Sequence, residues 1–187
     1  MPFPRNWVEE LASEWLVLKG YLVESNVRLR AKERGGVAEA DVIGIKVEYS
    51  QLQIMHIETG SLAKSYKDNL DWVENKFNKD NQQCVESFAK RKVPWDSGTK
   101  YKCMFVASSA SRASDLKDAL SSSQIQFWML DRFIEEMALP ALQDWKKEQV
   151  KVGLRKTNNP TLPECLWLLQ LVDFLELKQL LKKPQVH

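Results

Sequence analysis

The sequence is poor in the residue types that build hydrolase triads and zinc sites. It has two histidines, His56 and His187, and three cysteines, Cys84, Cys103 and Cys165. No pair of cysteines has a zinc-type spacing, and we expect three reduced thiols because disulfides are rare in the cytoplasm. A serine-histidine hydrolase or a histidine-rich metal site would depend on His56 alone, so both classes are disfavoured.

Long hydrophobic runs are also missing. The longest nearly apolar stretch, residues 166–177, is interrupted by Gln170, Asp173 and Glu176, and a membrane helix needs roughly 20 apolar residues. The first residues contain no apolar segment typical of a secretory signal. Neither of the glycine-rich patterns that cradle nucleotide phosphates occurs, which disfavours a nucleotide-binding enzyme. We therefore expect a cytoplasmic protein with no membrane partner.

The remaining composition is that of a globular protein. Hydrophobic residues make up 44% and charged residues 28% of 187 residues, enough for a real core. The net charge of +2 does not demand a nucleic-acid partner, but basic residues cluster at 28–34, 90–102 and 146–156. Each cluster is either a phosphate contact or solvated surface. The candidate nucleic-acid-binding residues in them are Arg28, Arg30, Lys90, Arg91 and Lys92.

Apolar periodicity predicts an α/β fold of the order α-βββ-α-β-α-β, with a mixed sheet flanked by helices. The expected helices are 5–19, a long one opened by Gly60 and capped by Ser61, 82–90, 111–121, and 131–148 with a break near Pro140. The expected strands are 21–30 with an irregularity near Ser25, then 37–48, 52–58, 101–108 and 125–130. The first three strands form an antiparallel meander, and pairing after residue 101 is parallel.

The last part of the chain differs from the rest. We assign residues 1–149 to the α/β domain and 150–187 to a polar linker followed by a leucine-rich helical extension. Apolar residues cover most of the circumference of this helix, so it packs on the domain or on a partner chain. We favour docking on the domain, with a homodimer or another protein partner as the alternative.

Two carboxylates stand out inside apolar strands. Asp41 precedes Val42 and Ile43, and Glu58 follows Ile57. On neighbouring antiparallel strands these carboxylates would repel each other, and burying them is costly unless they are paired or bind a metal. Hard oxygen ligands with few protein contacts suit Mg²⁺, which keeps several waters for a phosphate substrate.

The order and spacing of several short motifs resemble a known family. The motifs are Glu9-Glu10-Leu11-Ala12, Gly20-Tyr21, Asn26-Val27-Arg28, Glu39-Ala40-Asp41-Val42-Ile43 and Ile57-Glu58. Together they resemble the PD-(D/E)XK, restriction-endonuclease-like nuclease superfamily, in particular its Holliday-junction-resolvase-like branch. The resemblance covers about the first 70 residues well, while residues 100–130 agree only in element order. It implies a restriction-endonuclease-like core.

The resemblance implies a metal-dependent DNA endonuclease that acts on branched or double-stranded DNA with Mg²⁺ or Mn²⁺. Asp41 and Glu58 would hold the metal, with the carbonyl of Thr59 as a third ligand. A metal-bound water would be oriented by Glu9 or Glu10. The bound metal would lower the pKa of that water and stabilise the phosphate under attack.

The sequence departs from the family at the lysine that follows the glutamate by two residues, because this position is Gly60. In one interpretation Lys64 or Lys67 on the next helix supplies the missing charge, and Lys67 is also a candidate DNA contact. In the other, the site is degenerate and the domain binds nucleic acid or a protein without cleavage. His56 shares the strand face of Glu58 and lines the same cleft, or else is a packed residue.

Overall fold

The computed structural model describes residues 6–31, 37–95, 97–151 and 162–179. The elements are α1 (Trp7–Leu18), β1 (Leu22–Ala31), β2 (Val37–Glu48), β3 (Gln51–Leu62), α2 (Tyr66–Lys76), α3 (Lys79–Lys92), β4 (Thr99–Ala110), α4 (Ala113–Ser122), β5 (Ile125–Met129), α5 (Leu130–Phe133), the π-helix η1 (Ile134–Ala138), α6 (Leu139–Lys151) and α7 (Trp167–Leu177). The chain divides into two compact units, Met1–Leu130 and Asp131–His187. The second unit thus begins earlier than the extension that we expected at residue 150.

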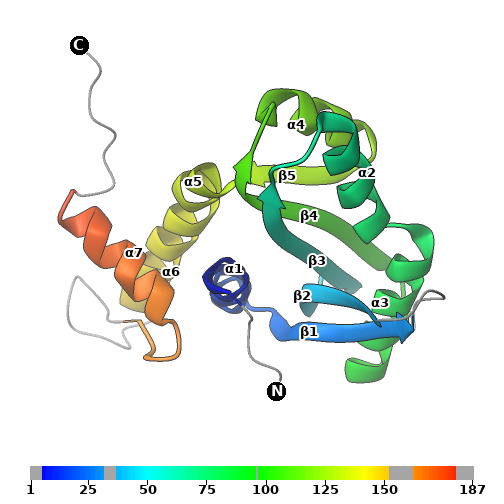
Figure 1. Cartoon of the computed structure of the whole chain (residues 1–187). Helices are drawn as coiled ribbons and strands as arrows, with labels where there is room; N and C mark the ends of the chain where they lie inside the picture. Colours follow the sequence, from blue (N-terminus) through cyan, green and yellow to red (C-terminus); the bar gives the residue numbers. More distant parts are fainter. Residues whose placement is uncertain (1–5, 32–36, 96, 152–161, 180–187) are drawn as a thin grey trace, which may run out of the picture. The chain divides into compact units, whose positions relative to one another are not determined.

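The first unit is built on one five-stranded sheet with the strands in sequence order, β1-β2-β3-β4-β5 (Figure 1). Strands β1, β2 and β3 pair antiparallel, whereas β3, β4 and β5 pair parallel. These pairings confirm the expected meander, the parallel second half and the α/β class with a mixed sheet flanked by helices.

Helices cover both faces of this sheet. Helices α2 and α4 pack on one face over a cluster that includes Phe105 and Phe127, and α3 packs beside them over Ile43 and Ile54. Helix α1 lies on the opposite face, where a Cβ at Gly44 would come 2.9 Å from Leu16 Cδ1. Glycine at this position therefore allows the helix to approach the strand closely.

The boundary between β3 and α2 differs from the prediction. We expected the strand to end at Glu58 and Ser61 to cap the following helix. Instead β3 continues to Leu62, because its parallel pairing with β4 extends through the last residues of both strands. Helix α2 begins at Tyr66, and its N-cap is Ser65, whose side chain accepts a hydrogen bond from the Asp68 amide.

Two other predicted irregularities appear in modified form. Near Ser25, Asn26 has a φ of 53°, and the β1–β2 register shifts between Arg28 and Arg30. Pro140 does not break the helix as expected. The π-helix η1 precedes it, with the Leu139 N–H donating to the Ile134 carbonyl. Proline has no N–H to donate, and the wider π-helical turn lets the helix continue past the missing hydrogen bond.

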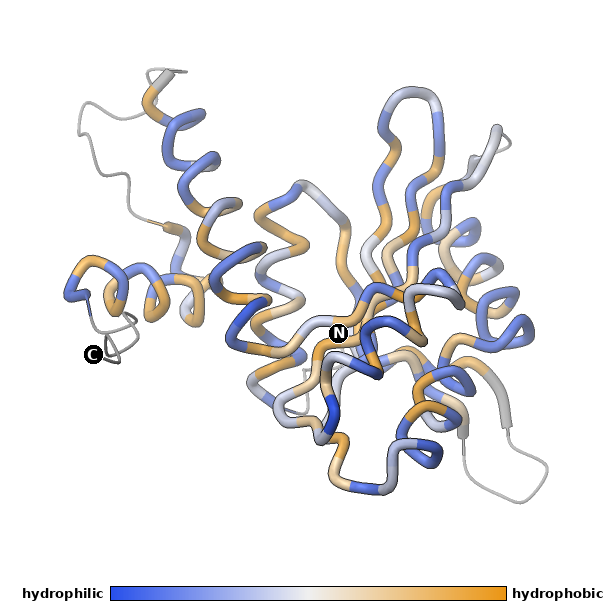
Figure 2. Tube along the Cα trace, turned by 90° about the horizontal axis from the view of Figure 1, so that it is seen from above, coloured by the Kyte–Doolittle hydropathy of each residue, from blue (hydrophilic) through white to orange (hydrophobic). Residues whose placement is uncertain are grey.

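The second unit consists of α5, η1, α6 and α7, whose sequences change between hydrophobic and hydrophilic at short intervals (Figure 2). Helix α7 buries Leu168, Leu169 and Val172 and leaves Trp167, Leu171, Phe174 and Leu177 exposed, so apolar residues lie on both its buried and its exposed sides. Lys146 Nζ on α6 bonds Asp173 Oδ1 on α7 at 2.6 Å. In the part of the chain that the structure describes, no helix has the length and apolar character needed to cross a bilayer.

Candidate active site

Asp41 and Glu58 lie on the same face of the sheet. Ile43 on β2 is paired with His56 on β3, and side chains two residues apart share a face, so Asp41 points to the same side as Glu58. Asp41 Oδ2 accepts hydrogen bonds from the Thr59 amide at 2.8 Å and from Thr59 Oγ1 at 3.3 Å. The antiparallel pairing thus brings together the two carboxylates predicted from the sequence.

Glu58 is fully buried, and both of its carboxylate oxygens are bonded. Oε1 lies 2.8 Å from His56 Nε2, and Oε2 accepts a hydrogen bond from Lys76 Nζ at 2.5 Å. The Lys76 side chain is 27% exposed, so its ammonium group lies at the boundary between the core and the solvent. A charge-assisted bond of this kind compensates a carboxylate that would otherwise be costly to bury.

Helix α2 runs antiparallel to β3 and places one cation above Glu58. Trp72 lies over Gly60, where an added Cβ would come 3.0 Å from Trp72 Cη2. One turn later in the helix, Lys76 reaches Glu58, two residues earlier in the strand. Since the indole fills the space above Gly60, a lysine there would clash with it, and the cation comes from the helix instead.

His56 connects the site to β4. Its Nδ1 lies 2.8 Å from the hydroxyl oxygen of Tyr101, and its ring packs edge-on against Phe77 with the centroids 4.8 Å apart. His56 is fully buried. The structure therefore places His56 as a packed residue that is bonded to Glu58, while its lining of a cleft stays a prediction.

The electrostatics of the site favour a bound cation. Burial raises the pKa of Asp41 to about 7, and the neighbouring Glu58 carboxylate adds to this effect. Burial alone would lower the pKa of Lys76, but attraction by Glu58 and Asp41 raises it instead. Lys76 is thus held as an ammonium ion, and Asp41 is a carboxyl group that a further positive charge would ionise.

The backbone contributes a further oxygen. In a strand the N–H and C=O of one residue point to the same side. Since the Thr59 amide donates to Asp41, its carbonyl also points toward the β2 side. Among the described residues no group of three histidine, cysteine, aspartate or glutamate side chains could hold a metal ion. Two carboxylates and one carbonyl form the smaller donor set used by a Mg²⁺ ion that keeps several waters.

The two glutamates predicted on α1 differ in their surroundings. Glu9 is buried, and its Oε1 accepts a hydrogen bond of 2.6 Å from the side-chain amide of Asn6, the N-cap of α1. Its charge contributes to the raised pKa of Asp41. Glu10 is half-buried one position further along the helix.

The lysines that we expected to replace the motif lysine lie beyond the end of β3. Lys64 and Lys67 are exposed, and the backbone amide of Lys64 donates to Asn69 Oδ1. The residue that reaches Glu58 is Lys76, which sequence reasoning missed. A signal existed, because Asn69 and Val73 are the buried positions of α2 and Lys76 follows Val73 by three residues, on the same helix face.

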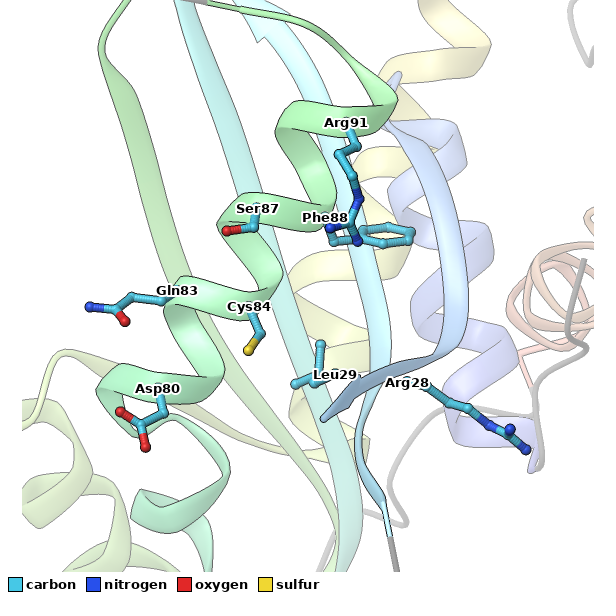
Figure 3. Close-up of a pocket in the computed structure, with 8 residues that line it drawn as sticks. All are labelled: Arg28, Leu29, Asp80, Gln83, Cys84, Ser87, Phe88 and Arg91. Carbon is cyan, nitrogen blue, oxygen red and sulfur yellow. The ribbon is translucent and has the colours of Figure 1, made fainter. Parts of the chain in front are cut away.

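Two of the basic candidates, Arg28 and Arg91, line a groove between α3 and β1. This groove has a volume of about 360 Å³, and Figure 3 shows its lining. The lining residues are Arg28, Leu29, Asp80, Gln83, Cys84, Ser87, Phe88 and Arg91. Lys90 is exposed nearby, whereas Lys92 bonds Glu24 at 2.7 Å. Arg30 belongs to β1, but its side chain lies outside the described residues.

The chain was also compared with known proteins. No protein-family model matches it, and no curated protein has a significantly similar sequence.

Proposed function

We propose that the protein is a metal-dependent endonuclease that hydrolyses phosphodiester bonds in branched or double-stranded DNA. The observation that carries this proposal is the contact of Lys76 with Glu58, beside Asp41. It supplies, from helix α2, the cation that the PD-(D/E)XK motif provides two residues after its glutamate. Asp41, Glu58 and the Thr59 carbonyl are the groups that would hold Mg²⁺ or Mn²⁺.

The chain's own residues then have distinct roles. A metal held here would supply a water of lowered pKa and positive charge for the phosphate. Lys76 neutralises Glu58 in the metal-free protein. Lys76 is also the cation of this site that would donate to the phosphate oxygens and offset the charge that develops on them. Glu9, on α1, would accept a hydrogen bond from the attacking water, which is the role that the resemblance implies for it.

The groove between α3 and β1 is the surface that we assign to the DNA backbone. Arg28 on β1 and Arg91 on α3 are among the residues that line it, with the Arg28 side chain pointing away from α3 (Figure 3), and guanidinium groups bind phosphates in a bidentate manner. Arg28 Nε also lies 3.9 Å from Glu39 Oε1, and the Arg28 side chain is 80% exposed. Such an exposed pair is weak, so Arg28 can exchange its carboxylate partner for a phosphate.

Cleavage assays with single substitutions test the proposal. We expect labelled four-way-junction or linear duplex DNA to be cut with Mg²⁺ or Mn²⁺ and not with EDTA. Lys76→Ala should lower the cleavage rate about 100- to 1000-fold, as the loss of one group that stabilises transition-state charge does. Asp41→Ala and Glu58→Ala should abolish cleavage. Lys64→Ala is the matched control, because this exposed lysine lies ahead of the same helix.

The alternative function is binding of nucleic acid or of a protein partner without cleavage. It is favoured by the fact that both oxygens of Glu58 are already bonded to protein groups. In that case DNA binding would be independent of metal and unchanged in Asp41→Ala, and no substrate would be cut.

For the cleavage assay, a cleavage rate that falls equally in Lys64→Ala and Lys76→Ala would contradict the role of Lys76.

A further inference from the structure

Three polar side chains, the half-buried Tyr101 and the fully buried His56 and Glu58, form a continuous hydrogen-bonded chain. The hydroxyl of Tyr101 lies 2.8 Å from His56 Nδ1, and His56 Nε2 lies 2.8 Å from Glu58 Oε1. Tyr101 is on β4 and the other two residues are on β3, whose parallel pairing sets Ile54 opposite Tyr101. The cleavage chemistry described above uses Glu58 but neither of the other two residues.

The direction of these hydrogen bonds follows from chemistry. Glu58 Oε2 accepts a hydrogen bond from the Lys76 ammonium, and a carboxylate only accepts. In the His56 tautomer that carries its proton on Nε2, the ring donates to Oε1 and accepts at Nδ1. The Tyr101 hydroxyl fills that role as donor, since burial raises the pKa of this phenol and keeps it protonated.

This chain fixes the orientation of the carboxylate. Phe77 packs edge-on against the His56 ring, and the Tyr101 hydroxyl holds its far nitrogen, so the Nε2–H vector toward Glu58 is constrained at both ends. The imidazole takes one carboxylate oxygen, Oε1, and leaves Oε2 facing Lys76. Two apolar side chains at positions 56 and 101 would fill the same space without the cost of removing polar groups from water. The presence of His56 and Tyr101 there therefore argues for a role beyond packing.

We propose that His56 and Tyr101 are positioning residues that hold Glu58 Oε2 toward the cation-binding side of the site. This role rests on the proposed metal site, so its test needs a measurement that distinguishes failure of the positioning role from failure of the metal site. Partners that orient metal ligands contribute about 10- to 100-fold in metal affinity. The affinity for the metal alone is therefore the quantity that His56 and Tyr101 should control.

Isothermal titration of the full chain with Mn²⁺, without DNA, tests this role. We expect His56→Leu to weaken Mn²⁺ binding about 10- to 100-fold. His56→Gln should largely restore it, because its amide nitrogen can still donate to Glu58. Tyr101→Phe, which removes only the hydroxyl, should give an intermediate loss. Cys103→Ala is the control, since Cys103 is buried on β4 opposite His56 and its thiol accepts a hydrogen bond from Gln82 Nε2 at 3.8 Å.

The outcomes are distinguishable. Thermal melting identifies any variant that fails to fold. If His56→Leu fails to fold, the Mn²⁺ affinity of Tyr101→Phe still tests the role. Unchanged affinity in Tyr101→Phe and folded His56→Leu, with Asp41→Asn weakening Mn²⁺ binding, would overturn the positioning role and keep the metal site. A loss in Cys103→Ala as large as in His56→Leu would also overturn it. If the wild type binds no Mn²⁺, or Asp41→Asn binds as the wild type does, the proposed metal site fails and the positioning role with it.

Discussion

At the residue scale, Asp41 is buried beside a second carboxylate, and both conditions make it a weaker acid than an exposed aspartate. Desolvation is the larger cause and the Glu58 carboxylate adds to it, while Lys76 and the Thr59 amide act in the opposite direction. The pKa of about 7 means that the folded, metal-free protein binds a proton that the unfolded chain releases near pH 4. Raised pKa values of this kind are typical of functional sites.

The stability of the metal-free protein should therefore fall as the pH rises through this range. A folded-state pKa raised above the unfolded value gives stability that is complete below about pH 4 and lost toward pH 7. Relative to Asp41→Asn, the wild type should lose roughly 1–3 kcal/mol between about pH 5 and pH 8, because each unit of pKa shift corresponds to about 1.4 kcal/mol. Urea unfolding in EDTA measures this difference, and parallel stability curves for the two proteins would contradict it.

At the element scale, the packing of α2 on β3 gives Gly60 a structural reason. Trp72 fills the space above Gly60 and contacts the Phe105 ring edge-on, with the centroids 5.6 Å apart. Lys76 Nζ lies 5.7 Å from the centroid of the Trp72 indole ring. The helix therefore provides both the apolar cover of the strand end and the cation for Glu58.

The hairpin between β2 and β3 offers a place for a stabilising substitution. Its two loop residues, Tyr49 and Ser50, have φ values of 51° and 57°, which the two-residue type I′ turn requires and which Asn-Gly adopts at lower cost. The double substitution Tyr49→Asn, Ser50→Gly should raise the unfolding free energy by about 1–2 kcal/mol. Urea denaturation measures this gain.

Tyr49→Ala is the control for this substitution, because it removes the same 90% exposed ring but keeps a side chain that disfavours positive φ. An equal gain in Tyr49→Ala would mean that the ring, and not the backbone conformation, is the cause.

At the scale of the whole molecule, charge is distributed unevenly over a chain with a net charge of only +2. The two arginines of the groove come from β1 and from the last turn of α3. Affinity for DNA should therefore depend on this surface rather than on the net charge.

Salt titration of DNA binding tests the assignment of the groove. Arg91→Ala and Arg28→Ala should each lower the slope of log affinity against log salt by about 1, as expected for one lost phosphate contact. Arg132→Ala is the control, since Arg132 belongs to the second unit and pairs with Glu135 at 3.2 Å. Fluorescence anisotropy of labelled duplex DNA gives the slopes. An unchanged slope in both groove variants would remove the groove from the DNA-binding surface.

The C-terminal helix carries an apolar stripe in addition to its buried face. Leu171, Phe174 and Leu177 are 45%, 52% and 60% exposed. The homodimer or protein partner that the leucine-rich sequence suggests stays a prediction, as does the docking of this segment on the domain.

The sequence by itself determined the order and type of the elements and the pairing of the two carboxylates. Strand side chains alternate with a period of two, so a short turn between β2 and β3 is enough to place Asp41 and Glu58 on one face. The buried positions of α2 follow in the same way from a period of 3.6 residues. These properties are local, because they depend on residues that are close in the chain.

Only the tertiary structure decided which cation meets Glu58 and where β3 ends. Lys76 is 18 residues from Glu58, and their contact depends on the direction in which α2 crosses the sheet. The extension of β3 through Gly60 depends on pairing with β4, more than 40 residues later in the sequence. The Tyr101 hydroxyl reaches His56 through the same pairing. The Lys76–Glu58 contact, the end of β3 and the Tyr101–His56 contact all depend on packing between segments that are distant in the chain, and local periodicity carries no information about such packing.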